Sequence, residues 1–136
     1  AMSRGLRNNN PGNIRLSKIK YLGEIPSTDS AFKQFKTMAW GYRAMFVLLH
    51  TYQLKHGCNT LRDMIDRYAP PIENHTDNYI KAVSDSSGVW PDVKITTTNK
   101  DIMVPVVAAM SRVENGVAAV IDDVNKGWEL FQQHKP

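Results

Sequence analysis

The residues of this sequence with the clearest potential for acid–base chemistry are carboxylates. The segment VAAMSRVENG, residues 107–116, predicts an apolar helix whose last turn carries Glu114 and which ends at Gly116. A desolvating core and the negative end of the helix dipole both raise the pKa of a carboxyl group in that position. The general acid of glycoside cleavage is such a protonated carboxyl group. Glu114 is therefore the first candidate acid; the alternative is a solvated glutamate near a helix end.

Other reactive side chains form no recognisable site. The four histidines stand at positions 50, 56, 75 and 134 and share no metal-type spacing. His50 and His56 are six residues apart, which places them on different faces of a helix. No serine lies in a nucleophile-elbow pattern, no glycine loop for phosphate is present, and Cys58 is the single cysteine. We therefore expect no metal, no cofactor and no internal disulfide.

A polar, turn-forming stretch lies near the start of the chain. RNNNPGNIR, residues 7–15, holds four Asn, one Pro and one Gly, which favour turns over helix. Two interpretations remain open for its amides. They line a cleft and bind a neighbouring loop or the N-acetyl groups of a sugar, with Asn10, Asn13 and Arg15 as substrate-binding candidates. Otherwise they form a self-bonded turn that anchors the N-terminus.

The elements that must position these residues are mostly helices. Residues 21–25 and 31–35 are expected to pair as a hairpin across 26–30. Helices are predicted over 38–56, 61–68, from a cap at Thr76 to Gly88, around 106–116 with Pro105 in the first turn or at a kink, and over 121–131 despite Gly127. The fold class is therefore mainly α (α+β), with a small β hairpin, in one domain over residues 3–136.

Composition narrows the range of partners. The 136 residues carry 17 basic and 13 acidic side chains, a net charge of +4, and 42% are hydrophobic. No apolar run approaches the roughly 20 residues of a membrane span, and no signal peptide is visible at the front. The basic residues are scattered singly, which argues against nucleic acid and suits an anionic cell wall.

Several short motifs resemble those of the lysozyme-like superfamily. RNNNPGNIR resembles the opening signature of small phage-associated wall-degrading proteins, and also the Asn-Leu-Phe-Gly-Ile-Lys turn of flagellar-type glucosaminidases. RYAPPIENHTDNYIKAV is similar to the glucosaminidase segment that places a cleft tyrosine, here Tyr79. MSRVENG resembles the Glu-Ser-Gly helix end of lytic transglycosylases, which carries their acid. The resemblance extends from Arg7 to about Gly116, and only the nonapeptide is specific.

The resemblance implies cleavage of peptidoglycan glycan strands by a muramidase, lytic transglycosylase or glucosaminidase. Glu114 would protonate the leaving oxygen, and Tyr79 would position groups near the reacting carbon or otherwise be a core residue. Glu24 falls where the glucosaminidase hairpin carries a second carboxylate, with Asp29 and Glu73 as alternatives. A second carboxylate that activates water implies inversion, whereas without one an internal muramyl hydroxyl attacks and leaves an anhydro sugar.

Further expectations follow from the same resemblance. Glu73 and Asn74 would contact substrate. Four aromatic side chains could stack on sugar rings, or otherwise belong to the core: Trp40, Trp90, Tyr21 and Tyr68. In lytic transglycosylases the acid-bearing helix precedes the Asn-rich turn, whereas here it follows. We therefore expect a circularly permuted order with neighbouring termini.

The resemblance also sets expectations for the whole molecule. We expect a monomer, made in the cytoplasm, that acts in the periplasm, on the cell wall or on a virion. The alternative function is a noncatalytic wall-binding component of a virion or secretion system.

Overall fold

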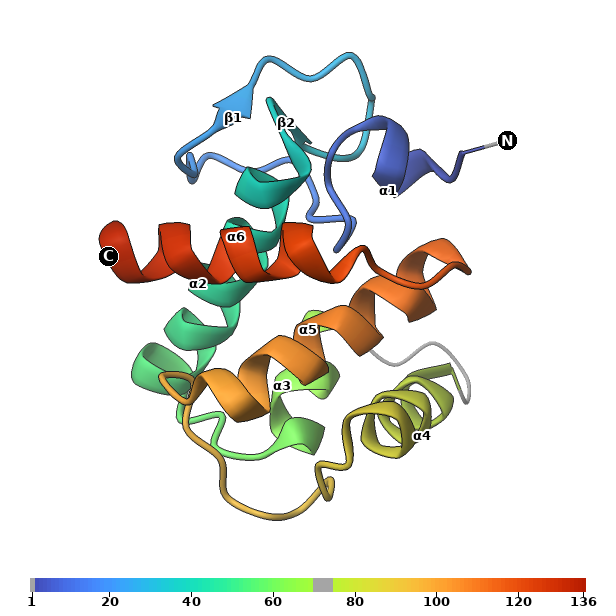
Figure 1. Ribbon diagram of the computed structural model, residues 1–136, viewed down its shortest axis with the longest axis vertical. Coiled ribbons are helices and arrows are strands. Elements are labelled where there is room, and N and C mark those ends of the chain that lie inside the picture. Colours follow the sequence, from blue (N-terminus) through green and yellow to red (C-terminus); the bar gives the residue numbers. More distant parts are fainter. Residues whose placement is uncertain (1, 70–74) are drawn as a thin grey trace.

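The computed structural model describes residues 2–69 and 75–136, which form helices and one two-stranded sheet (Figure 1). The elements follow the order α1 (Arg4–Arg7), β1 (Glu24–Ile25), β2 (Gln34–Phe35), α2 (Met38–His56), α3 (Leu61–Tyr68), α4 (His75–Ser87), α5 (Lys100–Asn115) and α6 (Ile121–Gln133). The predicted mainly α class with a small hairpin is confirmed. The buried apolar side chains of the described residues, from Ile14 to Phe131, form one core cluster.

The helix α2 forms the centre of this core. Thr37 caps its start by accepting a hydrogen bond from the Trp40 amide, and Gly57 ends it in the left-handed conformation at φ 64°. The last helix, α6, packs across α2 (Figure 1). A β-carbon at Gly127 would lie 2.6 Å from the Cβ of Tyr42, so glycine lets the two helices approach closely. This packing explains why α6 tolerates a glycine in its interior.

The helix α5 begins earlier than its apolar pattern predicts. Asn99 caps it by accepting from the Asp101 amide, and Gly116 ends it at φ 73°. Pro105 consequently lies in the second turn rather than in the first. A proline there leaves the Asp101 carbonyl without its helical donor, and because Asp101 is exposed, water can take the donor's place.

The start of α4 also differs from the prediction. The helix α4 begins at His75, and Thr76 lies within it rather than at its cap. The Thr76 hydroxyl donates to the carbonyl of Ala69, at 2.9 Å, and so ties the start of α4 to the end of α3. Thr76 is therefore a link between helices, and the predicted capping role is wrong.

The N-terminal segment combines a short helix, a tight loop and the hairpin. Ser3 caps α1 by accepting from the Leu6 amide. This helix has four residues, too few to show a helical period in the sequence. In the loop that follows, Asn9 and Asn13 take left-handed conformations at φ 50° and 48°. The strands β1 and β2 are antiparallel, with Glu24 opposite Phe35, as the predicted hairpin requires.

The two termini lie at opposite sides of the molecule (Figure 1), so the prediction that they are neighbours is wrong. The reason is α6, which follows α5 and carries the chain across α2, away from α1. The end of α5 takes the expected place instead: the Ser3 hydroxyl donates to Oδ1 of Asn115 at 2.7 Å. Among the described residues, no helix is both long and apolar enough to cross a membrane.

Candidate active site

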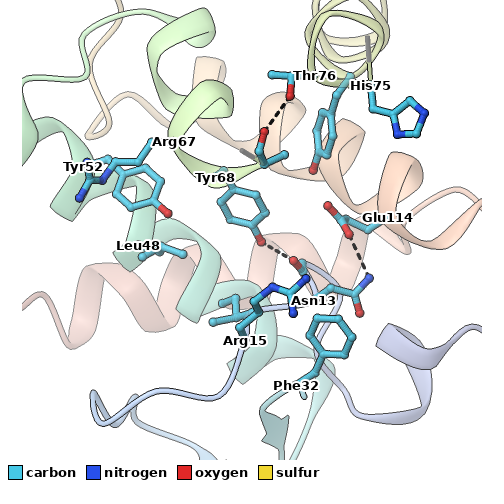
Figure 2. Close-up of a pocket in the computed structure, with 14 residues that line it drawn as sticks. Asn13, Arg15, Phe32, Leu48, Tyr52, Arg67, Tyr68, His75, Thr76 and Glu114 are labelled. Carbon is cyan, nitrogen blue, oxygen red and sulfur yellow. Dashed lines mark hydrogen bonds between the residues drawn. The ribbon is translucent and has the colours of Figure 1, made fainter. Parts of the chain in front are cut away.

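A pocket of about 520 Å³ lies between the N-terminal segment and helices α2 to α5 (Figure 2). Its volume falls within the range of about 300–1,000 Å³ that is usual for ligand sites. The described residues that line it are Gly12, Asn13, Ile14, Arg15, Phe32, Leu48, Tyr52, Arg67, Tyr68, Ala69, His75, Thr76, Tyr79 and Glu114. Glu114 is the one carboxylate among these lining residues.

Glu114 and the Asn-rich loop meet in this pocket. Glu114 is half-buried in the last turn of α5, and Nδ2 of Asn13 donates to its Oε1 at 3.0 Å (Figure 2). The two residues are 101 positions apart in the chain, so only the fold brings them together. The expectation that the Asn-rich loop lies beside Glu114 is confirmed.

Opposing influences act on the Glu114 carboxyl group. Burial is the largest and raises its pKa above the ordinary value. The hydrogen bond from Asn13, the Tyr79 hydroxyl and the charge of Arg15 act in the opposite direction, and the net effect is a raised pKa. The raised pKa agrees with the sequence-based expectation, and burial in the pocket is its leading cause.

Two tyrosines complete the surroundings of Glu114. Tyr79 is 8% exposed, and among the described residues its buried hydroxyl has no hydrogen-bond partner of normal geometry. Burial and the nearby Glu114 raise the pKa of Tyr79 well above its usual value, so the hydroxyl keeps its proton. The Tyr68 hydroxyl donates to the Gly12 carbonyl at 2.5 Å (Figure 2), and a β-carbon at Gly12 would collide with it. Glycine is therefore required where Tyr68 meets the loop.

Asn10, a predicted substrate-binding residue, supports the loop from inside. It is fully buried and does not line the pocket. Its amide donates to the carbonyls of Ile14 and Lys33 at 3.0 and 2.9 Å, and its oxygen accepts from the Ile14 amide. Because these backbone groups use its side chain, the predicted contact with substrate is wrong for Asn10. Its effect is to hold the turn that presents Asn13.

The structure does not bring Glu24 to the pocket. Its carboxylate accepts two hydrogen bonds from Nζ of the fully buried Lys33, at 3.1 and 3.0 Å, and one from the Tyr21 amide. A charge buried in this way needs its partner, so Glu24 is committed to the hairpin. The expectation that Glu24 faces Glu114 across the cleft is therefore wrong.

The other predicted residues have different positions. Asp29 pairs with Arg4 at 2.6 Å and accepts from Asn8, which together with backbone hydrogen bonds hold the pKa of Asp29 well below its usual range. Asp29 is not among the lining residues, whereas Arg15 is. Glu73 and Asn74 lie outside the described residues.

Aromatic and basic side chains that the sequence did not identify also line the pocket. Phe32 lies under the guanidinium of Arg15, 5.3 Å from ring centroid to Cζ, and Tyr52 lies in the same way under Arg67 at 5.4 Å. In the sequence Phe32 fits a strand and Tyr52 fits the buried face of a helix, so neither has a separate functional signal. Of the aromatic residues proposed for stacking, Tyr68 lines the pocket, whereas Trp40, Trp90 and Tyr21 do not.

The chemistry available in the pocket is therefore proton transfer by one carboxyl group, supported by amide, phenol and guanidinium groups. Within residues 2–69 and 75–136, no cluster of three His, Cys, Asp or Glu side chains could hold a metal ion. The residues that surround Glu114 come from the loop at 12–15, the end of α3 and the first turns of α4.

Comparison with known proteins finds a phage relative. The chain is 37% identical over 132 residues to Protein P5 of Pseudoalteromonas phage PM2, with 93% of this chain and 81% of the relative aligned. The chain belongs to the Protein P5 family. A family with a phage member agrees with the expected association with a bacteriophage, and is compatible with a virion. No protein-family model matches the chain. The name Protein P5 states no activity.

Proposed function

We propose that the protein cleaves the glycan strands of peptidoglycan, with Glu114 as the acid that protonates the leaving oxygen of the glycosidic bond. The observation that carries the proposal is the position of Glu114, half-buried at the end of α5 inside a pocket of about 520 Å³ and bonded to Asn13. The resemblance to lysozyme-like proteins supports the same assignment, because it places the acid at this helix end.

The surroundings of Glu114 suit a group that must give up a proton and take it back. Burial favours the neutral acid, which is the form that protonates the leaving group. Once the proton has left, the Asn13 amide and the charge of Arg15 stabilise the carboxylate. The Tyr79 hydroxyl, buried and protonated beside Glu114, can donate to the same carboxylate.

The second chemical step has fewer candidates than the sequence suggested. Glu24 is paired with Lys33 and does not line the pocket, so it is not placed to activate a water molecule there. Among the described lining residues no carboxylate other than Glu114 is present. This supports internal attack by a muramyl hydroxyl, with an anhydro sugar as product, as in lytic transglycosylases. Glu73 is the alternative base and lies outside the described residues.

Aromatic rings on the lining support a glycan substrate, and a contact at the end of α5 supports the resemblance. Phe32 and Tyr52 are aromatic rings on its lining, and sugar rings pack well on such faces. The end of α5 also contacts the start of the chain through Ser3 and Asn115, at 2.7 Å. This contact supports a permuted order, since it joins the acid-bearing helix end to the Asn-rich segment that follows it in lytic transglycosylases.

Loss of turbidity of purified sacculi tests the proposal. Glu114→Gln keeps the shape and the acceptor oxygen for Asn13 but has no proton to transfer. We expect its rate to fall by at least about a hundredfold, the usual contribution of a general acid. Glu129→Gln, at an exposed position on α6, is the matched control and should retain the wild-type rate.

Full activity of folded Glu114→Gln would reject the assignment. A wild-type protein that sediments with sacculi but never clears them would instead favour the noncatalytic wall-binding function. Mass spectrometry of the released fragments then separates anhydro products from hydrolysed ends.

A further inference from the structure

A second hollow, of about 540 Å³, adjoins the candidate active site. Leu48 on α2 lines both, and Figure 2 places Leu48 on the side of the first pocket away from Glu114. The second hollow continues along α2 to Thr51 and Lys55 and is bounded by residues 19–22 and by the last residues of the chain. A polymer that occupies the first pocket and passes Leu48 would therefore reach this hollow.

Arg43 gives the second hollow a buried positive charge. It lines the hollow and is 4% exposed. One guanidinium nitrogen donates to the His134 carbonyl, while Nε has no hydrogen-bond partner among the described residues. No carboxylate of the described residues forms an ion pair with Arg43, and burial lowers its pKa. Buried arginines are normally paired, so Arg43 lacks an anion.

The other charged side chains of the described lining are also basic. Lys55 and Lys135 are exposed, and neither forms an ion pair with a described residue. Lys20 also lines the hollow and lies 3.5 Å from the Glu24 carboxylate, which it shares with Lys33. No acidic side chain is among the described lining residues. A hollow with one buried and two exposed unpaired cations favours an anionic occupant.

We propose that this basic hollow binds the carboxylate groups of the peptide stems that project from the glycan strand held in the neighbouring pocket. Arg43 supplies a planar donor group suited to a carboxylate, and Lys55 and Lys135 add charge at the entrance. The inference rests on the proposed function, because it takes peptidoglycan as the polymer in the first pocket. It adds a substrate preference: strands with acidic stems bind better than bare strands.

Binding of soluble glycan fragments tests this proposal separately from catalysis. Calorimetry compares fragments that carry their peptide stems with the same fragments after an amidase has removed the stems. Glu114→Gln serves as the parent protein, so that no fragment is cut. We expect the parent to bind stem-bearing fragments about tenfold more tightly, as a few partly exposed charge pairs would give.

The double variant Lys55→Gln/Lys135→Gln should lose most of that preference and keep its affinity for bare fragments. It changes only exposed side chains, so it avoids the risk that Arg43→Gln does not fold. The matched control, Lys100→Gln/Lys126→Gln, removes two exposed lysines that do not line the hollow and should keep the preference.

Equal affinity of the parent for both fragments would overturn the proposal, as would a preference that survives the double variant. Binding to anionic phospholipid vesicles that the double variant abolishes, without any stem preference, would also overturn it and assign the hollow to a lipid headgroup. If sacculi are not cleaved but the stem preference holds, the proposed function fails and this inference stands as wall recognition.

Discussion

The protonation of Glu114 depends on a balance between burial and the groups that contact its carboxyl. Burial raises its pKa, while Asn13, Tyr79 and Arg15 lower it. A general acid works only while protonated, so the proposed activity should fall as the pH rises through the pKa of Glu114. Any change that removes a hydrogen bond to the ionised form moves that fall to higher pH.

Asn13→Gly tests this balance at a single residue. The substitution removes the amide that donates to Glu114 at 3.0 Å, and glycine accepts the left-handed conformation of Asn13 without strain. We expect the pKa of Glu114 to rise further and the alkaline limb of the pH–rate profile to move to higher pH. An NMR titration of the Glu114 side chain measures the same shift without any substrate.

Asn9→Gly is the control for the glycine substitution itself. Asn9 also has a positive φ, and its amide donates to the Phe35 carbonyl instead of Glu114. Its profile should match that of the wild type. An Asn13→Gly profile that stays in place, or moves to lower pH, would show that this hydrogen bond does not tune Glu114.

At the residue scale, the sequence correctly predicted four residues of the pocket: Asn13, Arg15, Tyr79 and Glu114. Each stands in a short motif or at a helix end, where local pattern carries information. The predicted roles of Asn10 and Glu24 were wrong, because a polar residue type does not show whether its partner is substrate or a buried group of the protein. Glu24 pairs with Lys33, nine positions away, and no local sequence pattern predicts that Lys33 is buried.

At the scale of elements, the hairpin depends on the ion pair between Glu24 and Lys33. Lys33 is fully buried, and its ammonium also donates to the Ile19 carbonyl at 2.7 Å, so it ties the loop before β1 to the sheet. Loss of one partner leaves the other charge buried and uncompensated. Glu24 therefore belongs to the framework that holds residues 14–35 together.

Glu24→Gln tests that role. We expect the free energy of unfolding, measured with urea, to fall by about 3–5 kcal/mol, the usual cost of breaking a buried pair. The exposed Glu129→Gln control should stay within about 0.5 kcal/mol of the wild type. A Glu24→Gln protein of undiminished stability that had lost activity would instead return Glu24 to the catalytic candidates.

The elements predicted best are those with a clear period and a clear end. The bounds of α2 and α3 agree with the apolar spacing and with Gly57 as the end of α2, and the structure adds Thr37 and Thr60 as their N-caps. The prediction was less successful for α5, because Pro105 suggested a helix start that the Asn99 cap places earlier. The short α1 has no periodic signal, and its stability depends on contact with α5.

For the whole molecule, the pocket exists because the N-terminal segment docks onto the helices. Asn115 at the end of α5 accepts from Ser3 and donates to the carbonyl of Pro11 at 2.8 Å, while Tyr68 bonds to Gly12. These contacts join residues that are far apart in sequence. The expected closeness of the termini was wrong because the sequence does not give the path of α6, which depends on packing against α2.

Asn115→Ala should loosen this docking while the helical core stays closed. The variant removes the hydrogen bonds to Ser3 and Pro11. We therefore expect the free energy of local opening of the N-terminal loop to fall by about 1–3 kcal/mol, the usual effect of leaving partly buried polar groups unpaired. Hydrogen exchange measures this opening: the amides of Asn10, Asn13 and Ile14, which are bonded within the segment, should exchange faster, and those of α2 and α6 at the wild-type rate. Asn125→Ala on α6 is the control and should leave the loop protected. Faster exchange spread evenly over the chain would mean that the segment and the core unfold together.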